Sequence, residues 1–172
     1  MNGIGVILGI LFSTSLFAKP LPTTPQVDVG RYVGKWYAHY SLPQFFTRNC
    51  RGQTAEYEVI NERKISVLNT CLKRRGVTTI SGQAVVLNPG VTSRLEVTFD
   101  NFFTRLFRVK GDYTIIKLDP DYEYVLVGSA DRKSLWLMSR SDVAIPDAVR
   151  EEYLGFAREL GFNTGRLVES RF

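Results

Sequence analysis

The chain has 172 residues, of which 44% are hydrophobic and 23% charged, and its formal net charge is +5. This length favours one domain, and the composition permits a buried core and argues against bulk disorder. A single histidine and two cysteines exclude zinc fingers, iron–sulfur clusters and multi-histidine metal sites. The isoelectric point near 9.3 permits nucleic acid, anionic lipid or small acidic molecules as partners.

The N-terminus has the pattern of an export signal. Residues 3–17 are apolar and uncharged, but this run is too short for a membrane span, which needs about 20 apolar residues. Ala18 ends a small-residue cleavage pattern, so we predict a signal peptide over 1–18, with an uncleaved anchor as the alternative. No cysteine stands at this cleavage point, so we expect an exported protein, periplasmic or secreted, without a lipid anchor there. Three prolines in 19–26 predict a flexible leader before a domain over 27–172.

The middle of the chain consists of short segments that alternate between apolar and polar residues and are separated by turn residues. Eight such segments at regular spacing indicate an antiparallel meander, which can close into a barrel around one small ligand. They are residues 36–41, 54–59, 64–68, 79–87, 94–100, 112–118, 122–128 and 134–139.

The periodicity becomes helical after the last of these segments. Pro146 suits a first helical position, and Gly161 ends the pattern. We therefore predict one amphipathic helix that packs on the outer wall of the barrel, with a ninth edge strand expected within 165–170. The apolar stripe consists of Val149, Tyr153, Phe156 and Leu160.

The two cysteines test the predicted strand pairing. The midpoint between Cys50 and Cys71 falls beside the predicted hairpin turn at 61–63, so the two residues should lie nearly opposite each other. An oxidising compartment would let them form a disulfide, which would stabilise the fold by roughly 3 kcal/mol.

Catalytic chemistry has little support in this sequence. His39 is the only imidazole base, no Gly-x-Ser-x-Gly elbow is present, and no phosphate-binding loop occurs. Arginine and phenylalanine interleave in 101–110, but no nucleic-acid-binding signature accompanies them. We therefore expect no catalytic residues, no cofactor, no metal and no nucleic acid.

Three segments resemble the sequence motifs of the lipocalins. Residues 34–37 (Gly-Lys-Trp-Tyr) resemble the first motif, residues 118–122 (Leu-Asp-Pro-Asp-Tyr) the second, and residues 135–140 (Leu-Trp-Leu-Met-Ser-Arg) the third. The ending of the third motif resembles the bacterial branch of the family, which is similar to apolipoprotein D. A departure is Pro120, where the family favours threonine. The rival barrel of the fatty-acid-binding proteins would place two helices near 42–52, where no helical pattern occurs.

The resemblance implies an all-β fold: an eight-stranded antiparallel up-and-down barrel, or calyx, with a C-terminal helix outside. It also implies that Trp36 plugs one end, with Arg140 across its ring in a cation–π contact. The residues expected to be structural are Gly34, Trp36, Asp121, Tyr122 and Arg140.

If Trp36 points into the barrel, strict alternation predicts the remaining lining. This lining is apolar apart from tyrosine hydroxyls, and Gly82 and Gly128 would leave room in it. Lys117 has inward parity at the closed end and is not counted. A dry core that fills the barrel is the alternative to a ligand pocket. The predicted lining residues are Ala38, Tyr40, Ala55, Tyr57, Val59, Val67, Ile80, Ala84, Leu95, Val97, Phe99, Tyr113, Ile115, Tyr124, Leu126, Trp136 and Met138.

The resemblance also places four loops at the open end, and these loops hold the excess positive charge. Phenylalanines accompany the arginines in two of them, where they would form a lid or touch a membrane. The rim residues expected to contact ligand are Phe45, Phe46, Arg48, Arg51, Arg75, Arg105 and Arg108, with Phe102, Phe103 and Phe107 beside them.

These features predict an exported lipocalin that binds or transports a hydrophobic anionic ligand, such as a fatty acid or lysophospholipid, in an apolar calyx with a basic mouth. We expect a monomer or weak homodimer whose partner is this small lipid. Two alternatives stay open. One is an envelope protein that docks a membrane or partner through its Phe/Arg-rich rim, and the other is a lipid-modifying lipocalin-like enzyme.

Overall fold

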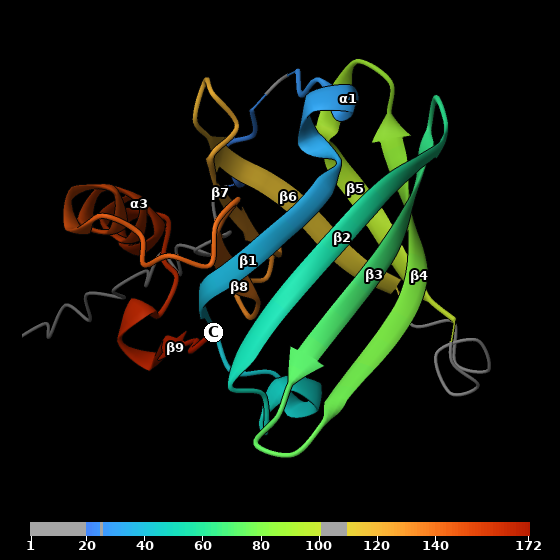
Figure 1. Ribbon diagram of the computed structural model, residues 1–172. Coiled ribbons are helices and arrows are strands. Elements are labelled where there is room, and N and C mark those ends of the chain that lie inside the picture. Colours follow the sequence, from blue (N-terminus) through green and yellow to red (C-terminus); the bar gives the residue numbers. More distant parts are fainter. Residues whose placement is uncertain (1–19, 25, 101–109) are drawn as a thin grey trace, which may run out of the picture.

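The computed structural model describes residues 20–24, 26–100 and 110–172, which form an eight-stranded barrel with one short additional strand (Figure 1). The predicted signal peptide, Arg105, Arg108 and the three phenylalanines near them lie outside the described residues. The strands are β1 (Gly34–Ser41), β2 (Gly52–Asn61), β3 (Lys64–Leu72), β4 (Val77–Asn88), β5 (Val91–Phe99), β6 (Lys110–Leu118), β7 (Tyr124–Gly128), β8 (Leu135–Ser139) and β9 (Val168–Glu169).

Each of the first seven strands pairs antiparallel with the next, and β1 pairs with both β2 and β8, which closes the barrel. Trp36 lies opposite Ala55 in β2, and Ala38 lies opposite Met138 in β8. The end of β1 also pairs with β9, Ser41 opposite Val168. The predicted all-β barrel and its ninth edge strand are therefore confirmed.

In the described part of the chain, four helices accompany the strands. The helix α3 (Asp147–Glu159) lies beside the barrel on its outside, and its N-cap is Pro146. Gly161 follows it with φ of 88°, a left-handed conformation that glycine adopts without strain. The others are α1 (Val29–Tyr32), η1 (Phe45–Thr47) and η2 (Thr164–Arg166). Within the described ranges, no helix has the length and apolarity needed to cross a membrane.

The apolar residues form two cores separated by the barrel wall. The interior core contains Trp36, Tyr57 and Val97 among its members. The second core lies between the wall and α3, where Tyr153 and Ala157 of the helix meet Leu137 of β8. The predicted helix and its outer position are thus confirmed.

Strict alternation fails on β1 because the strand carries a bulge. The register with β8 shifts between Ala38 and Tyr40, so Tyr40 joins the outer core instead of the lining, and its hydroxyl donates to Oε1 of Glu169 at 3.0 Å. Ser41, opposite the interior residue Trp136, returns to the inner face. The inward placement predicted for Tyr40 is therefore corrected.

A second bulge in β6, between Ile115 and Lys117, turns Lys117 outward. Its ammonium lies 2.5 Å from Oε1 of Glu152 and 4.8 Å from the ring centroid of Tyr153 on α3. The inward parity expected for Lys117 is thereby corrected, and Lys117 helps to hold α3 on the wall.

The predicted faces of β7 are also reversed. Val125 and Val127 lie opposite the interior residues Met138 and Trp136, while Tyr124 and Leu126 join the outer core. Alternation was a poor guide because α3 covers the outer face, so Val125, Leu126 and Val127 are all fully buried.

Gly128 faces outward too. A Cβ atom there would lie 2.8 Å from Cζ of Phe162 and 3.0 Å from Cδ1 of Ile116. The absence of a side chain therefore makes room for Phe162 in the outer core and not for a ligand.

The described part of the predicted leader packs on the barrel. Leu21 is buried in the outer core, its carbonyl accepts from Nη2 of Arg94 at 3.4 Å, and the amide of Thr24 donates to the carbonyl of Ile115. The proline-rich composition concealed these contacts.

Candidate functional site

The closed end of the barrel is sealed by Trp36 and Arg140. Trp36 is completely buried, and its Nε1–H donates to the carbonyl of Tyr32 at 2.9 Å. The guanidinium carbon of Arg140 lies 3.9 Å from the Trp36 ring centroid. Its nitrogens donate to five backbone carbonyls, those of Arg31, Tyr32, Val33, Lys35 and Tyr122.

Gly34 and the loop between β6 and β7 complete this end. Gly34 has φ of 95°, and a Cβ atom there would lie 3.4 Å from Nη1 of Arg140. The hydroxyl of Tyr122 accepts a hydrogen bond from the amide of Asp28 at 2.9 Å. The carboxylate of Asp119 accepts hydrogen bonds from the amides of Asp121 and Tyr124 and thereby fixes this turn.

Above the Trp36 plug, three tyrosines form a hydrogen-bonded group in the interior. The Tyr113 hydroxyl lies 2.6 Å from the Tyr32 hydroxyl and 3.0 Å from that of Tyr57. Burial raises the pKa of Tyr57 to about 12. Burial, reinforced by neighbouring phenols, also raises the pKa values of Tyr32 and Tyr113 well above 10. These hydroxyls stay neutral at physiological pH and put weak polarity into an otherwise apolar space.

The tyrosine group predicts an alkaline loss of stability. The pKa values of these tyrosines are raised in the folded state. Their contribution to the free energy of unfolding is therefore complete below about pH 10, and this contribution is lost as the pH rises through the folded-state pKa. Each tyrosine that ionises only on unfolding should lower the free energy of unfolding by about 1.4 kcal/mol per pH unit across this window. Urea titrations at about pH 9 and pH 11 measure this, and Tyr57→Phe should remove one tyrosine's share. An unchanged pH slope in Tyr57→Phe would contradict the assignment.

The interior lining is apolar over most of its depth, and much of it matches the predicted set. Phe99, Tyr113 and Trp136 are partly buried against the interior core, and Ile80 shares the face of Ala55 through the register of β2, β3 and β4. A Cβ atom at Gly82 would overlap the Thr98 carbonyl oxygen and lie 3.0 Å from the Phe99 ring, so this glycine makes room for β5 itself. Val59 is 53% exposed at the end of β2 and does not line the interior. The predicted residues buried in the interior core are Ala38, Ala55, Tyr57, Val67, Ala84, Leu95, Val97, Ile115 and Met138.

A polar band toward the open end was missed by the sequence-based prediction. Asn69 lies opposite both Ala55 and Ile80, which places it on the inner face, and it is partly buried. Gln53 lies opposite Ala38, and its Nε2 donates to Oγ of Ser41 at 3.1 Å. Continuing the period of two from Val67 and Ala55 would have found Asn69 and Gln53, whereas the β1 bulge hid Ser41.

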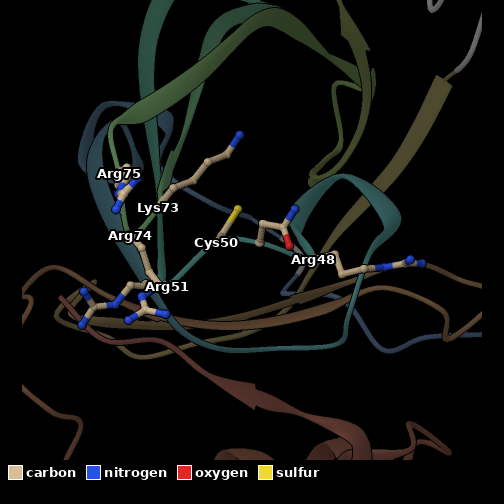
Figure 2. A pocket seen from close by; sticks show the side chains of 7 residues that line it. Arg48, Cys50, Arg51, Lys73, Arg74 and Arg75 are labelled. Carbon is tan, nitrogen blue, oxygen red and sulfur yellow. The ribbon is translucent and has the colours of Figure 1, made fainter.

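The mouth carries a hollow of about 840 Å³ lined by five cationic side chains (Figure 2). They come from the segment before β2 and from the turn between β3 and β4, and no described acidic side chain forms a salt bridge with any of them. The cations are therefore available to an external anion. The lining consists of Arg48, Asn49, Cys50, Arg51, Lys73, Arg74 and Arg75.

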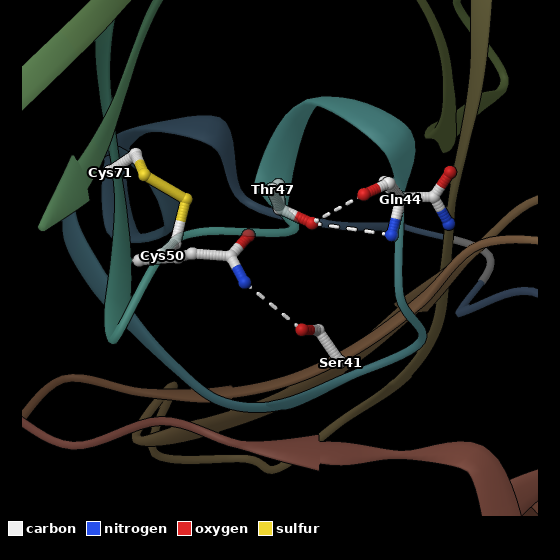
Figure 3. Close-up of a disulfide and its surroundings, with 6 residues drawn as sticks. Ser41, Gln44, Thr47, Cys50 and Cys71 are labelled. Carbon is white, nitrogen blue, oxygen red and sulfur yellow. Dashed lines mark hydrogen bonds between the residues drawn. A yellow bond between two sulfur atoms is a disulfide. The ribbon is translucent and has the colours of Figure 1, made fainter. Parts of the chain in front are cut away.

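The Cys50–Cys71 disulfide joins the two segments that supply these cations (Figure 3). The predicted bridge is confirmed, with a Cα–Cα distance of 5.2 Å. The amide of Cys50 also donates to the carbonyl of Thr47, which ties η1 to the disulfide. The bridge thus holds the β1–β2 loop and the β3–β4 turn together at one side of the mouth.

The predicted rim phenylalanines Phe45 and Phe46 lie on η1, where they are 83% and 68% exposed. They belong to the outer surface of the rim and not to the interior core. His39, the only imidazole, is buried elsewhere, with Nε2 2.9 Å from both Oγ of Ser139 and the carbonyl of Ser141. The structure therefore does not bring His39 to the mouth.

Comparison with known proteins identifies the family. The sequence model described as "Lipocalin-like domain" matches residues 27–171. The outer membrane lipoprotein Blc of Vibrio cholerae is 30% identical and covers 98% of this chain and 97% of its own length. Blc of Escherichia coli K12 is 31% identical over 82% of this chain and 77% of its own, and apolipoprotein D of Oryctolagus cuniculus is 30% identical over 85% and 77%.

Solved structures support the same fold at lower sequence identity. Insecticyanin from the tobacco hornworm superposes with a TM-score of 0.69, 16% identity and coverage of 90% of this chain and 85% of its own. Lobster apocrustacyanin A1 superposes with a TM-score of 0.65, 13% identity and coverage of 88% and 90%. From the family match and the bacterial relatives, the chain belongs to the lipocalin family.

Proposed function

We propose that this lipocalin is exported to the cell envelope and there binds or carries an amphiphile with an apolar chain and an anionic head. The proposal combines the family's binding of small hydrophobic ligands with the envelope location in the names of the Blc relatives. The predicted N-terminal signal points in the same direction.

The observation that carries the proposal is the order of surfaces along the barrel axis. An apolar interior rises from Trp36 and the tyrosine group and passes a polar band at Asn69 and Gln53. Beyond this band lies the hollow with five cations that lack a described acidic partner. An acyl chain gains about 0.8 kcal/mol for each buried methylene group, and the cations would hold its carboxylate or phosphate.

Competition binding tests the proposal directly. The delipidated full chain should bind palmitate, which displaces a fluorescent lipid, and also hexadecanol, which has the same chain length but no charge. Arg74→Gln/Arg75→Gln should weaken palmitate binding by roughly tenfold, because a charge-assisted hydrogen bond contributes roughly 1.5 kcal/mol or more. Hexadecanol binding should change far less.

A matched control uses the opposite end of the barrel. Arg63 and Lys64 are neighbouring cations at the β2–β3 turn, so Arg63→Gln/Lys64→Gln removes the same charge from the closed end. This variant should bind palmitate like the wild type. Failure of every anionic amphiphile to displace the probe would refute the function, and equal losses in both double variants would refute the basic mouth.

A further inference from the structure

We propose that the rim formed by η1 and the β3–β4 turn docks on an anionic lipid bilayer, with the open end of the barrel facing the membrane. This inference concerns the outer surface of the protein and does not depend on which ligand enters the interior. Three independent observations on the described residues support it.

The first observation is a presented pair of aromatic side chains. Phe45 and Phe46 are neighbours on η1 and are among the most exposed large apolar residues of the described chain. The turn that carries them is well bonded. The Thr47 hydroxyl accepts from the amide of Gln44 and donates to its carbonyl, and Nε2 of Gln44 donates to the carbonyl of Lys133. Both rings are therefore held outward, where burial in a lipid interface would remove apolar surface from water.

The second observation is the charge beside these rings. The guanidinium carbon of Arg48 lies 5.3 Å from the Phe45 ring centroid, and Arg48 also lines the hollow with four further cations. Aromatic and cationic groups thus share one continuous surface. Basic clusters next to apolar residues are attracted to anionic lipid headgroups.

The third observation is the contrast with the closed end. Exposed acidic residues occur there, with Glu62 in the β2–β3 turn and Asp121 and Glu123 in the β6–β7 loop. These acids balance the cations of the closed end, such as Arg31 and Arg63, whereas the hollow at the mouth gathers five cations without a described acidic partner. A negatively charged surface would therefore orient the molecule with its mouth toward the membrane.

These observations favour a bilayer over a protein partner. A bilayer offers dense negative charge directly above an apolar layer, which matches cations of one sign placed beside two exposed rings. In this orientation an acyl chain would pass between the bilayer and the barrel without crossing bulk water.

Vesicle co-sedimentation of the full chain tests the proposal. Wild type should bind vesicles that contain phosphatidylglycerol more tightly than pure phosphatidylcholine vesicles, and high salt should weaken the binding by screening. Phe45→Ser/Phe46→Ser and Arg74→Gln/Arg75→Gln should each weaken it by roughly tenfold. All variants share the same N-terminus, so differences among them report on the rim alone.

Two matched controls come from the closed end of the same hairpin. Val59 and Ile60 are 53% and 48% exposed, so Val59→Ser/Ile60→Ser removes an exposed apolar pair from the opposite end, and Arg63→Gln/Lys64→Gln removes the same charge as the arginine variant. Neither should change vesicle binding. Rim variants that bind like wild type, or controls that lose binding equally, would overturn the docking.

A fluorescence experiment locates the rim directly. Phe45→Trp, made in a Trp136→Phe background so that the buried Trp36 is the only other tryptophan, should show an emission blue shift with anionic vesicles that the Trp136→Phe parent lacks. No shift, or rim-dependent capture of an envelope protein without vesicle binding, would also overturn the proposal. Palmitate binding without vesicles is measured separately, so failure of the ligand proposal and failure of docking give different results.

Discussion

Replacement of Arg140 by alanine should lower the free energy of unfolding by about 2–4 kcal/mol, one of the largest effects expected for a single substitution in this protein. The guanidinium joins five backbone carbonyls from α1, its flanking residues and the β6–β7 loop, and it lies on the Trp36 ring. Alanine would remove all five bonds, would take this donor from the part-buried carbonyls of Val33 and Tyr122, and would open the seal over the tryptophan.

Two further variants separate this role from a general effect of charge. Arg140→Lys keeps the charge but should recover little stability, because one ammonium cannot reach carbonyls spread around a planar guanidinium. Arg150→Ala removes an arginine that pairs with Asp147 and Glu151 on the surface of α3, and its urea midpoint should stay near wild type. A lysine variant as stable as wild type would contradict this account of Arg140.

Removal of the disulfide is the second change with a large expected effect. Cys50→Ala/Cys71→Ala should lower the free energy of unfolding by about 3 kcal/mol, since the bridge closes a loop with a sequence separation of 21 residues. Urea unfolding without reductant measures the loss, and the wild type measured with reductant should match the double variant. Equal stability of oxidised wild type and double variant would contradict the prediction.

The same double variant should also change the binding site. The bridge holds Arg48 and Arg51 next to Lys73, Arg74 and Arg75, so without it like charges would separate. Palmitate binding should therefore weaken more than hexadecanol binding at a temperature where both proteins remain folded. An equal loss for both ligands would show that the disulfide supports the barrel but not the basic mouth.

The barrel was predictable because most strands have one face in the core and the other in water. On β2, for example, the buried Ala55 and Tyr57 alternate with Glu56 and Glu58, and a short turn follows. The interior lining could be predicted wherever this contrast exists. On β7 this contrast does not exist, because α3 covers the outer face and makes Leu126 as buried as Val125. No polar side chain then marks which face of the strand lies outside.

The basic hollow was only partly predictable. The sequence places Arg48 and Arg75 in loops that the lipocalin resemblance assigns to the open end, and the disulfide prediction brings those loops together. It does not show that Gln53 and Ser41 join inside the mouth, because that contact depends on the bulge in β1. Bulges arise from the local backbone and from packing across the sheet, and no residue type marks them reliably.

The bulge in β1 gives the strand one residue more than its pairing with β8 requires. Ala38 faces the interior and Tyr40 faces α3, although strict pleating would put both on one side. Deletion of His39 would make Ala38 and Tyr40 neighbours on opposite faces, as their partners Met138 and Leu137 already are. The inside and outside of the barrel would therefore survive this deletion. Its cost would be the buried contacts of the His39 ring with Ser139 and Ser141.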